Sequence, residues 1–143
     1  MFRPEEGLYD YPQAIDLLQQ AARHYPDSVA LSNISDNIKD ERDRLMDRLL
    51  SLYKRYYTER KLIKTPDGKD LTTVIPIIKR VDPKHYLLKD QELANLYLSE
   101  SEKLIGGGKF KDAANYINTG LKLFPEDTRL QSLNKQINAQ TLN

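Results

Sequence analysis

One spacing of residues occurs twice in this chain. Its two copies are Tyr11, Ala14, Leu18, Ala21 and Pro26, and Phe110, Ala113, Ile117, Gly120 and Pro125. Steps of three and four residues place the first four members of each copy on one face of a helix. The proline then ends the helix, because its ring excludes the helical conformation for the residue before it. A packing unit that recurs together with its terminator predicts an all-α array of helices.

The composition limits the classes of protein to which the chain can belong. Its 143 residues include 22 basic and 21 acidic side chains, a balance that argues against a dedicated nucleic-acid binder. There is no cysteine, which excludes disulfides and thiolate metal sites. No apolar run approaches the roughly 18 residues of a membrane span, and the N-terminus lacks an apolar signal core. We therefore expect one globular, cytoplasmic domain over residues 1–143.

Periodic apolar residues predict about six helices, one of them unusually long. The predicted helices cover residues 11–24, 28–63, 73–81, 90–105, 109–123 and 127–138. Polar residues that can act as N-caps precede three of them, namely Asp10, Asp27 or Ser28, and Asp90. The glycines at 106–108 end the fourth helix, since three adjacent glycines disfavour helix continuation.

Two of these segments leave alternatives open. The long helix contains a stretch without apolar residues, Lys39–Arg44, which is either solvated or a bend between two shorter helices. The short third helix contains Pro76, which is comfortable only in a first turn, so we expect Thr72 or Thr73 to be its N-cap. Dense β-branched residues also allow a strand over 72–78, although no other segment would pair with it.

A helix pair that is joined by a glycine turn and closed by a proline resembles the tetratricopeptide repeat. The best match covers 97–125, where these residues fit the family pattern: Tyr97, Leu104, Gly108, Phe110, Ala113, Ile117, Leu121 and Pro125. Glu100 and Gly120 depart from it, and the pattern elsewhere in the chain is degenerate. The resemblance implies an irregular α-α superhelix.

The resemblance also implies a function. Arrays of this family are non-enzymatic scaffolds for protein–protein interaction, often assembly or regulatory parts of larger proteins, including bacterial signalling proteins. The family's carboxylate clamp is not expected, because Leu98, Ser99 and Glu102 stand at the corresponding places. Residues 11–26 match only the second helix of a pair. We therefore expect either that the chain is a fragment of a longer protein or that a short N-terminal segment replaces the missing helix.

The sequence offers little for catalysis, and we expect no enzyme, cofactor or metal site. His24 and His85 have no carboxylate beside them at a recognised ligand spacing. The glycines before Lys109 lack the flanking strand and the Ser or Thr of a phosphate-binding loop, so a turn between helices is the favoured interpretation.

Two surfaces are candidates for a partner. Basic and aromatic residues gather at Tyr53, Tyr57, Arg60, Lys61 and Lys64. They are part of the core and its solvated rim, or they bind an acidic peptide, or, less favoured, single-stranded RNA. The second candidate is the narrow apolar stripe Leu31, Ile34 and Ile38, which one monomer need not cover. It allows the alternative that the helix over 28–63 forms a homodimer.

Overall fold

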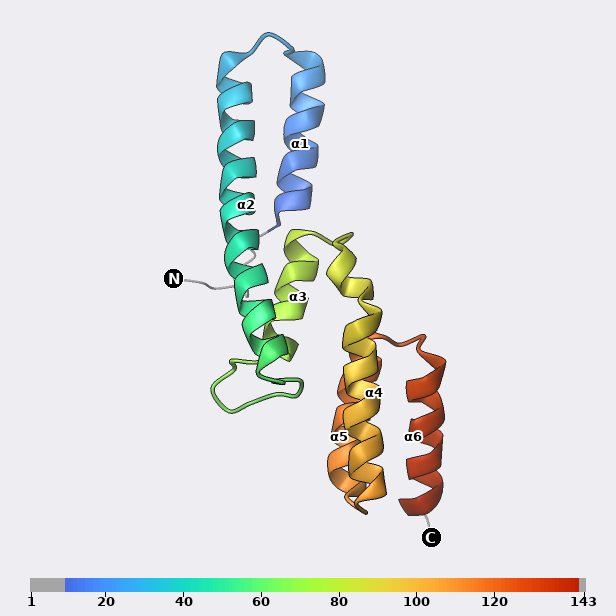
Figure 1. The fold of residues 1–143 in the computed structure, drawn as a ribbon. Coiled ribbons are helices and arrows are strands. Elements are labelled where there is room, and N and C mark those ends of the chain that lie inside the picture. Colours follow the sequence, from blue (N-terminus) through green and yellow to red (C-terminus); the bar gives the residue numbers. More distant parts are fainter. Residues whose placement is uncertain (1–9, 142–143) are drawn as a thin grey trace. The chain divides into compact units, whose positions relative to one another are not determined.

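The computed structural model describes residues 10–141, with side chains placed for 10–139, and every regular element in that range is a helix (Figure 1). The elements are α1 (Tyr11–His24), α2 (Val29–Thr58), α3 (Leu71–Val81), the 3-10 helix η2 (Tyr86–Lys89), α4 (Gln91–Gly106), α5 (Phe110–Leu123) and α6 (Thr128–Thr141). The all-α prediction is confirmed. The strand considered for 72–78 is wrong, because these residues lie in α3. None of the described helices is both long and apolar enough to cross a membrane.

Helix α2 is continuous but ends earlier than predicted. It runs through Lys39–Arg44 without interruption, and it stops at Thr58 instead of residue 63. Arg60 adopts a left-handed conformation with φ of 57°, and the N–H of Lys61 donates to the carbonyl oxygen of Tyr56 at 2.8 Å. This hydrogen bond closes the helix in the way that a C-terminal glycine usually does. With no glycine or proline there, the sequence contains no local signal for this end.

Helix α3 begins two residues before its predicted start. Asp70, and not Thr72 or Thr73, is the N-cap: its carboxylate accepts hydrogen bonds from the backbone N–H of Thr73 at 3.2 Å and from the hydroxyl of Thr72. Pro76 therefore lies inside the helix and beyond its first turn. It donates no helical hydrogen bond to the carbonyl of Thr72, a loss that the helix tolerates.

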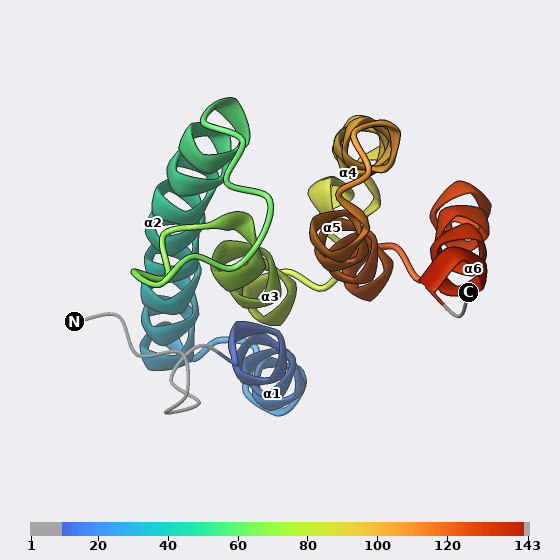
Figure 2. The ribbon, with the colours of Figure 1, turned by 90° about the horizontal axis from the view of Figure 1, so that it is seen from below.

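The internal contacts of the chain group its residues into two compact units. Unit 1 comprises Met1–Arg55 and Val74–His85, and unit 2 comprises Tyr56–Thr73 and Tyr86–Asn143. In unit 1, α1 and the first half of α2 run antiparallel and side by side (Figure 1). In unit 2, α5 packs against both α4 and α6 (Figure 2). The N-terminal segment that was considered as a replacement helix lies outside the described residues.

The two copies of the repeated spacing end with the same local backbone. Tyr25 has φ −132° and ψ 64°, and Phe124 has φ −130° and ψ 69°. In each copy the N–H of this aromatic residue donates to a carbonyl four residues earlier, that of Ala21 at 3.0 Å and that of Gly120 at 2.7 Å. The proline follows directly in both copies.

The next helix also starts in the same way in both copies. Ser28 accepts a hydrogen bond from the N–H of Leu31 at 3.2 Å, and Asp127 accepts one from the N–H of Leu130 at 3.1 Å. The predicted N-caps Ser28, Asp10 and Asp90 are thus confirmed. Residues 99 positions apart thus occupy equivalent places at the end of one helix and the start of the next, although α5 and α6 pack more closely on each other than α1 and α2 do.

Candidate interaction surface

The aromatic members of the predicted basic cluster are largely covered. Tyr53 belongs to unit 1 and is only 6 % exposed. Tyr57, in unit 2, is half-buried, and the guanidinium carbon of Arg60 lies 5.7 Å from the centroid of its ring. Burial raises the pKa of Tyr57, and the carboxylates of Asp90 and Glu92 raise it further. Single-stranded RNA needs exposed rings on which bases can stack, and these two tyrosines do not supply them.

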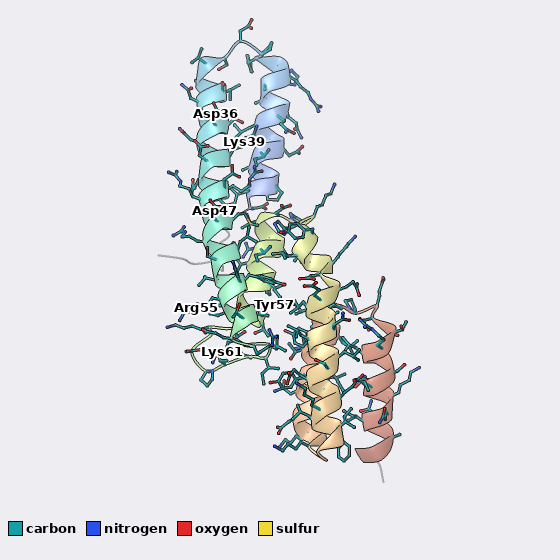
Figure 3. The ribbon with its side chains drawn as sticks, in the orientation of Figure 1. Asp36, Lys39, Asp47, Arg55, Tyr57 and Lys61 are labelled. Atoms are coloured by element: carbon teal, nitrogen blue, oxygen red, sulfur yellow. The ribbon has the colours of Figure 1, made fainter. Side chains whose placement is uncertain are left out.

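The basic members of the cluster are exposed, and one of them donates a hydrogen bond to the end of α2. The Nη1 atom of Arg60 donates to the carbonyl oxygen of Tyr57 at 3.0 Å, which satisfies an acceptor at the C-terminus of α2. Lys61 and Lys64 are exposed in the loop that follows. Figure 3 shows Tyr57 and Lys61 at this end of α2. The cluster is therefore a helix end and a basic loop.

A buried carboxylate that sequence reasoning missed organises this loop. Asp70 is fully buried and accepts hydrogen bonds from the backbone N–H and the hydroxyl of Thr65, at 2.9 and 3.1 Å. Burial by itself would raise the pKa of Asp70, but the hydrogen bonds from Thr65 and Thr72 outweigh burial and lower it. Both carboxylate oxygens are thus occupied within the chain, and Asp70 has a structural role.

Tyr97 connects the same loop to α4. Its side chain is fully buried, and its hydroxyl donates to the carbonyl oxygen of Leu62 at 2.5 Å. Burial raises the pKa of Tyr97 far above the usual range, so the phenol stays protonated and remains a donor. The sequence identified Tyr97 as a packing residue, but it held no signal for this hydrogen bond across 35 positions.

Helix α4 covers one side of the α5–α6 pair. A Cβ built at Gly120 would lie 3.1 Å from Cβ of Tyr97 and 3.0 Å from Cδ1 of Leu130, so the absence of a side chain at 120 permits the close approach of α4. Further along, Nη1 of Arg129 donates to Oδ1 of Asn95 in α4 at 2.7 Å.

The remaining members of the predicted repeat in unit 2 occupy varied environments. Ala113 and Ile117 are fully buried, Leu104 and Phe110 are half-buried, and Pro125 is exposed. Gly108 has φ of 74°, the left-handed conformation that favours glycine at a helix end.

The described residues of unit 1 do not cover the equivalent side of the α1–α2 hairpin. Tyr11 is buried and its hydroxyl donates to Oε1 of Glu41 at 3.1 Å, but no residue from Pro12 to Arg44 is buried. Ala14, Leu18 and Ala21 are only half-buried, and Pro26 is exposed. Large apolar side chains that are exposed in this hairpin are Leu17 at 57 %, Tyr25 at 67 %, Val29 at 72 % and Ile34 at 47 %.

Helical spacing groups apolar residues on each of the two helices. Ala14, Leu17 and Ala21 share one face of α1, and Ala30 and Ile34 share one face of α2. Their equivalents, 99 positions later, include Gly120 and Arg129, the residues at which α4 contacts α5 and α6. We call the surface formed by Ala14, Leu17, Ala21, Ala30 and Ile34 the open face. The sequence pointed to Ile34 but not to Leu17, because Leu17 lies outside the repeated spacing.

The described residues contain no group of three or more histidine, aspartate or glutamate side chains that could hold a metal ion. His24 is exposed and His85 is half-buried. Comparison with protein-family models, with curated proteins and with solved structures found no match for the chain.

Proposed function

We propose that this chain is a non-enzymatic protein-interaction module and that the open face of the α1–α2 hairpin is its binding surface. The observation that carries the proposal is the contrast between the two equivalent helix pairs. In α5–α6 the positions Ala113, Ile117 and Leu130 are fully buried, whereas Ala14, Leu18 and Leu31 at the equivalent places of α1–α2 are only half-buried. Exposed apolar surface of this kind commonly marks a contact with another protein.

The charge pattern around the open face supports the same proposal. The neighbours of Leu17 three and four positions away along α1 are Gln13, Ala14, Gln20 and Ala21. Those of Ile34 along α2 are Ala30, Leu31, Asn37 and Ile38. None of these residues is charged, although charged residues make up 30 % of the chain. The cores of protein interfaces are depleted of charge in the same way. The resemblance to tetratricopeptide repeats, whose helix pairs present surfaces to protein partners, is consistent with this.

Photo-crosslinking in cells that express the protein tests the proposal. A photoreactive phenylalanine analogue at Leu17 should yield an adduct with a defined protein partner, because this side chain lies in the open face. The matched control places the analogue at Asp47, an exposed position of α2 in unit 1 (Figure 3). The control should give no such adduct. No adduct at Leu17, or the same adducts at both positions, would contradict the proposed function.

A further inference from the structure

We infer that the partner of the open face is the open face of a second copy of this chain, so that two α1–α2 hairpins close a four-helix bundle. This inference rests on the proposed function, because it names the occupant of the same surface. A pair of helices has two sides, and the part of the hairpin from Pro12 to Arg44, in which no residue is buried, gains a core when a second layer of helices covers it. A second hairpin supplies such a layer with helices of matching length.

The charges of the open face are compatible with a symmetric contact. In a two-fold dimer each patch meets its own copy, so a patch with net charge would repel itself. The residues three and four positions from Leu17 and Ile34 are apolar or are the amides Gln13, Gln20 and Asn37, and Nε2 of Gln20 already donates to Oδ2 of Asp16 at 2.9 Å. An amide side chain both donates and accepts hydrogen bonds, and it can therefore pair with its own copy. Glu41, further along α2, accepts the hydroxyl hydrogen of Tyr11 in the same chain.

The order of side-chain sizes along α1 is also self-complementary. Leu17 lies between the small residues Ala14 and Ala21, three positions after one and four before the other. A second α1 that runs in the opposite direction presents the same small–large–small order. Each Leu17 can then lie beside the alanines of the opposing helix, where the short side chains leave room for it.

A second copy that docked its α4 on the open face in the way that α4 docks within unit 2 would meet a tighter contact there. That arrangement brings Tyr97 to Gly120, where an added Cβ would lie 3.1 Å from Cβ of Tyr97. Ala21 is the equivalent of Gly120 and already carries this Cβ. The methyl group of Ala21 therefore disfavours an exchange of α4 between copies, by the same overpacking that we expect for Gly120→Ala, and favours hairpin-to-hairpin contact as the mode of self-association.

Sedimentation velocity of the purified chain over a concentration series tests the inference. We expect the mass to rise from 16.6 kDa toward twice that value, with a dissociation constant on the order of micromolar. Ile34→Glu should raise that constant at least about tenfold, because it introduces two like charges into a symmetric contact. Circular dichroism of the variant should match the wild type, since Ile34 is already 47 % exposed.

The matched control is Ser32→Glu, which adds the same charge on the same helix. Ser32 is exposed and lines the groove on the other side of the hairpin together with Gln19 and Ala22. This variant should dimerise like the wild type. A wild-type chain that remains monomeric at several hundred micromolar, or equal effects of the two variants, would overturn the inference. A monomer that still gives an adduct with a different protein at Leu17 would overturn only the self-association and leave the proposed function standing.

Discussion

Replacement of Gly120 by alanine tests the packing of α4 on α5 and α6. The added Cβ would lie 3.0 Å from Cδ1 of Leu130 and 3.1 Å from Cβ of Tyr97. Optimal carbon–carbon contacts are about 3.5–4.0 Å, so the neighbours must move. Tyr97 can yield little, because its Cβ is bonded to the backbone and its hydroxyl is hydrogen-bonded to Leu62.

The expected change in stability is the difference between two opposing effects. Overpacking of a filled core costs about 1–3 kcal/mol. Alanine gains about 1 kcal/mol over glycine inside a helix. We therefore expect Gly120→Ala to lower the free energy of unfolding by up to about 2 kcal/mol. Urea unfolding followed by circular dichroism measures this change as a shift of the midpoint.

Gly106→Ala is the matched control. Gly106 is the last residue of α4, and a Cβ added there meets no heavy atom within 4 Å. The same chemical change should therefore leave the stability unchanged or raise it by up to about 1 kcal/mol. If Gly120→Ala were as stable as Gly106→Ala, the close approach of Tyr97 to α5 would be refuted.

Three further substitutions test the interior of unit 2. Ala113→Leu should lower the free energy of unfolding in urea by about 1–3 kcal/mol, because residue 113 is fully buried. An unchanged urea midpoint would contradict that burial. Tyr97→Phe should cost about 1–3 kcal/mol, because it leaves the buried carbonyl of Leu62 without its donor, and a neutral result would argue against that hydrogen bond. Asp70→Asn should also lower the free energy of unfolding by about 1–3 kcal/mol near neutral pH. The reason is that one acceptor oxygen becomes an NH₂ group, which faces the donors of Thr65 or Thr72. Since folding lowers the pKa of Asp70, its carboxylate stabilises the wild type above the unfolded pKa of about 3.9, and this stabilisation is lost as the pH falls through the folded pKa. The difference in the free energy of unfolding between the wild type and Asp70→Asn should therefore become smaller below about pH 4. A difference that stays constant down to about pH 2 would contradict this prediction.

Local signals predicted most of the helices. Asp10, Ser28 and Asp90 cap helices as expected from their side chains. The end of α1 before Pro26 follows from steric exclusion by the proline ring. These features depend on neighbouring residues only, and a single sequence is enough to find them.

The errors occurred at two helix ends that carry no recognisable residue pattern, and where a contact distant in sequence buries a loop residue. Helix α2 ends because Arg60 takes the left-handed conformation, and α3 starts early because Asp70 reaches back to Thr65. Helix α2 was predicted to reach residue 63 because Ile63 continues its apolar spacing. In the structure this segment is a loop, in which Leu62 is buried and its carbonyl oxygen accepts a hydrogen bond from the hydroxyl of Tyr97. The open face was predicted in part. The sequence predicted Ile34 as part of an apolar stripe that one monomer need not cover. It gave no such prediction for Leu17, whose exposure is a finding of the structure.

Native-state hydrogen exchange tests the central claim most directly, namely that the α1–α2 hairpin has an open face that another protein surface covers. Helices α1 and α5 are matched for this purpose, because each has 14 residues and both carry the repeated spacing. At concentrations where the chain is monomeric, amides of α1 should exchange at least about tenfold faster than those of α5, because α1 buries Tyr11 alone, whereas α5 buries Ala113, Ile117 and Gly120. When the open face is occupied, the exchange of α1 should slow and that of α5 should not change. Equally slow exchange of α1 and α5 in the monomer would contradict the account.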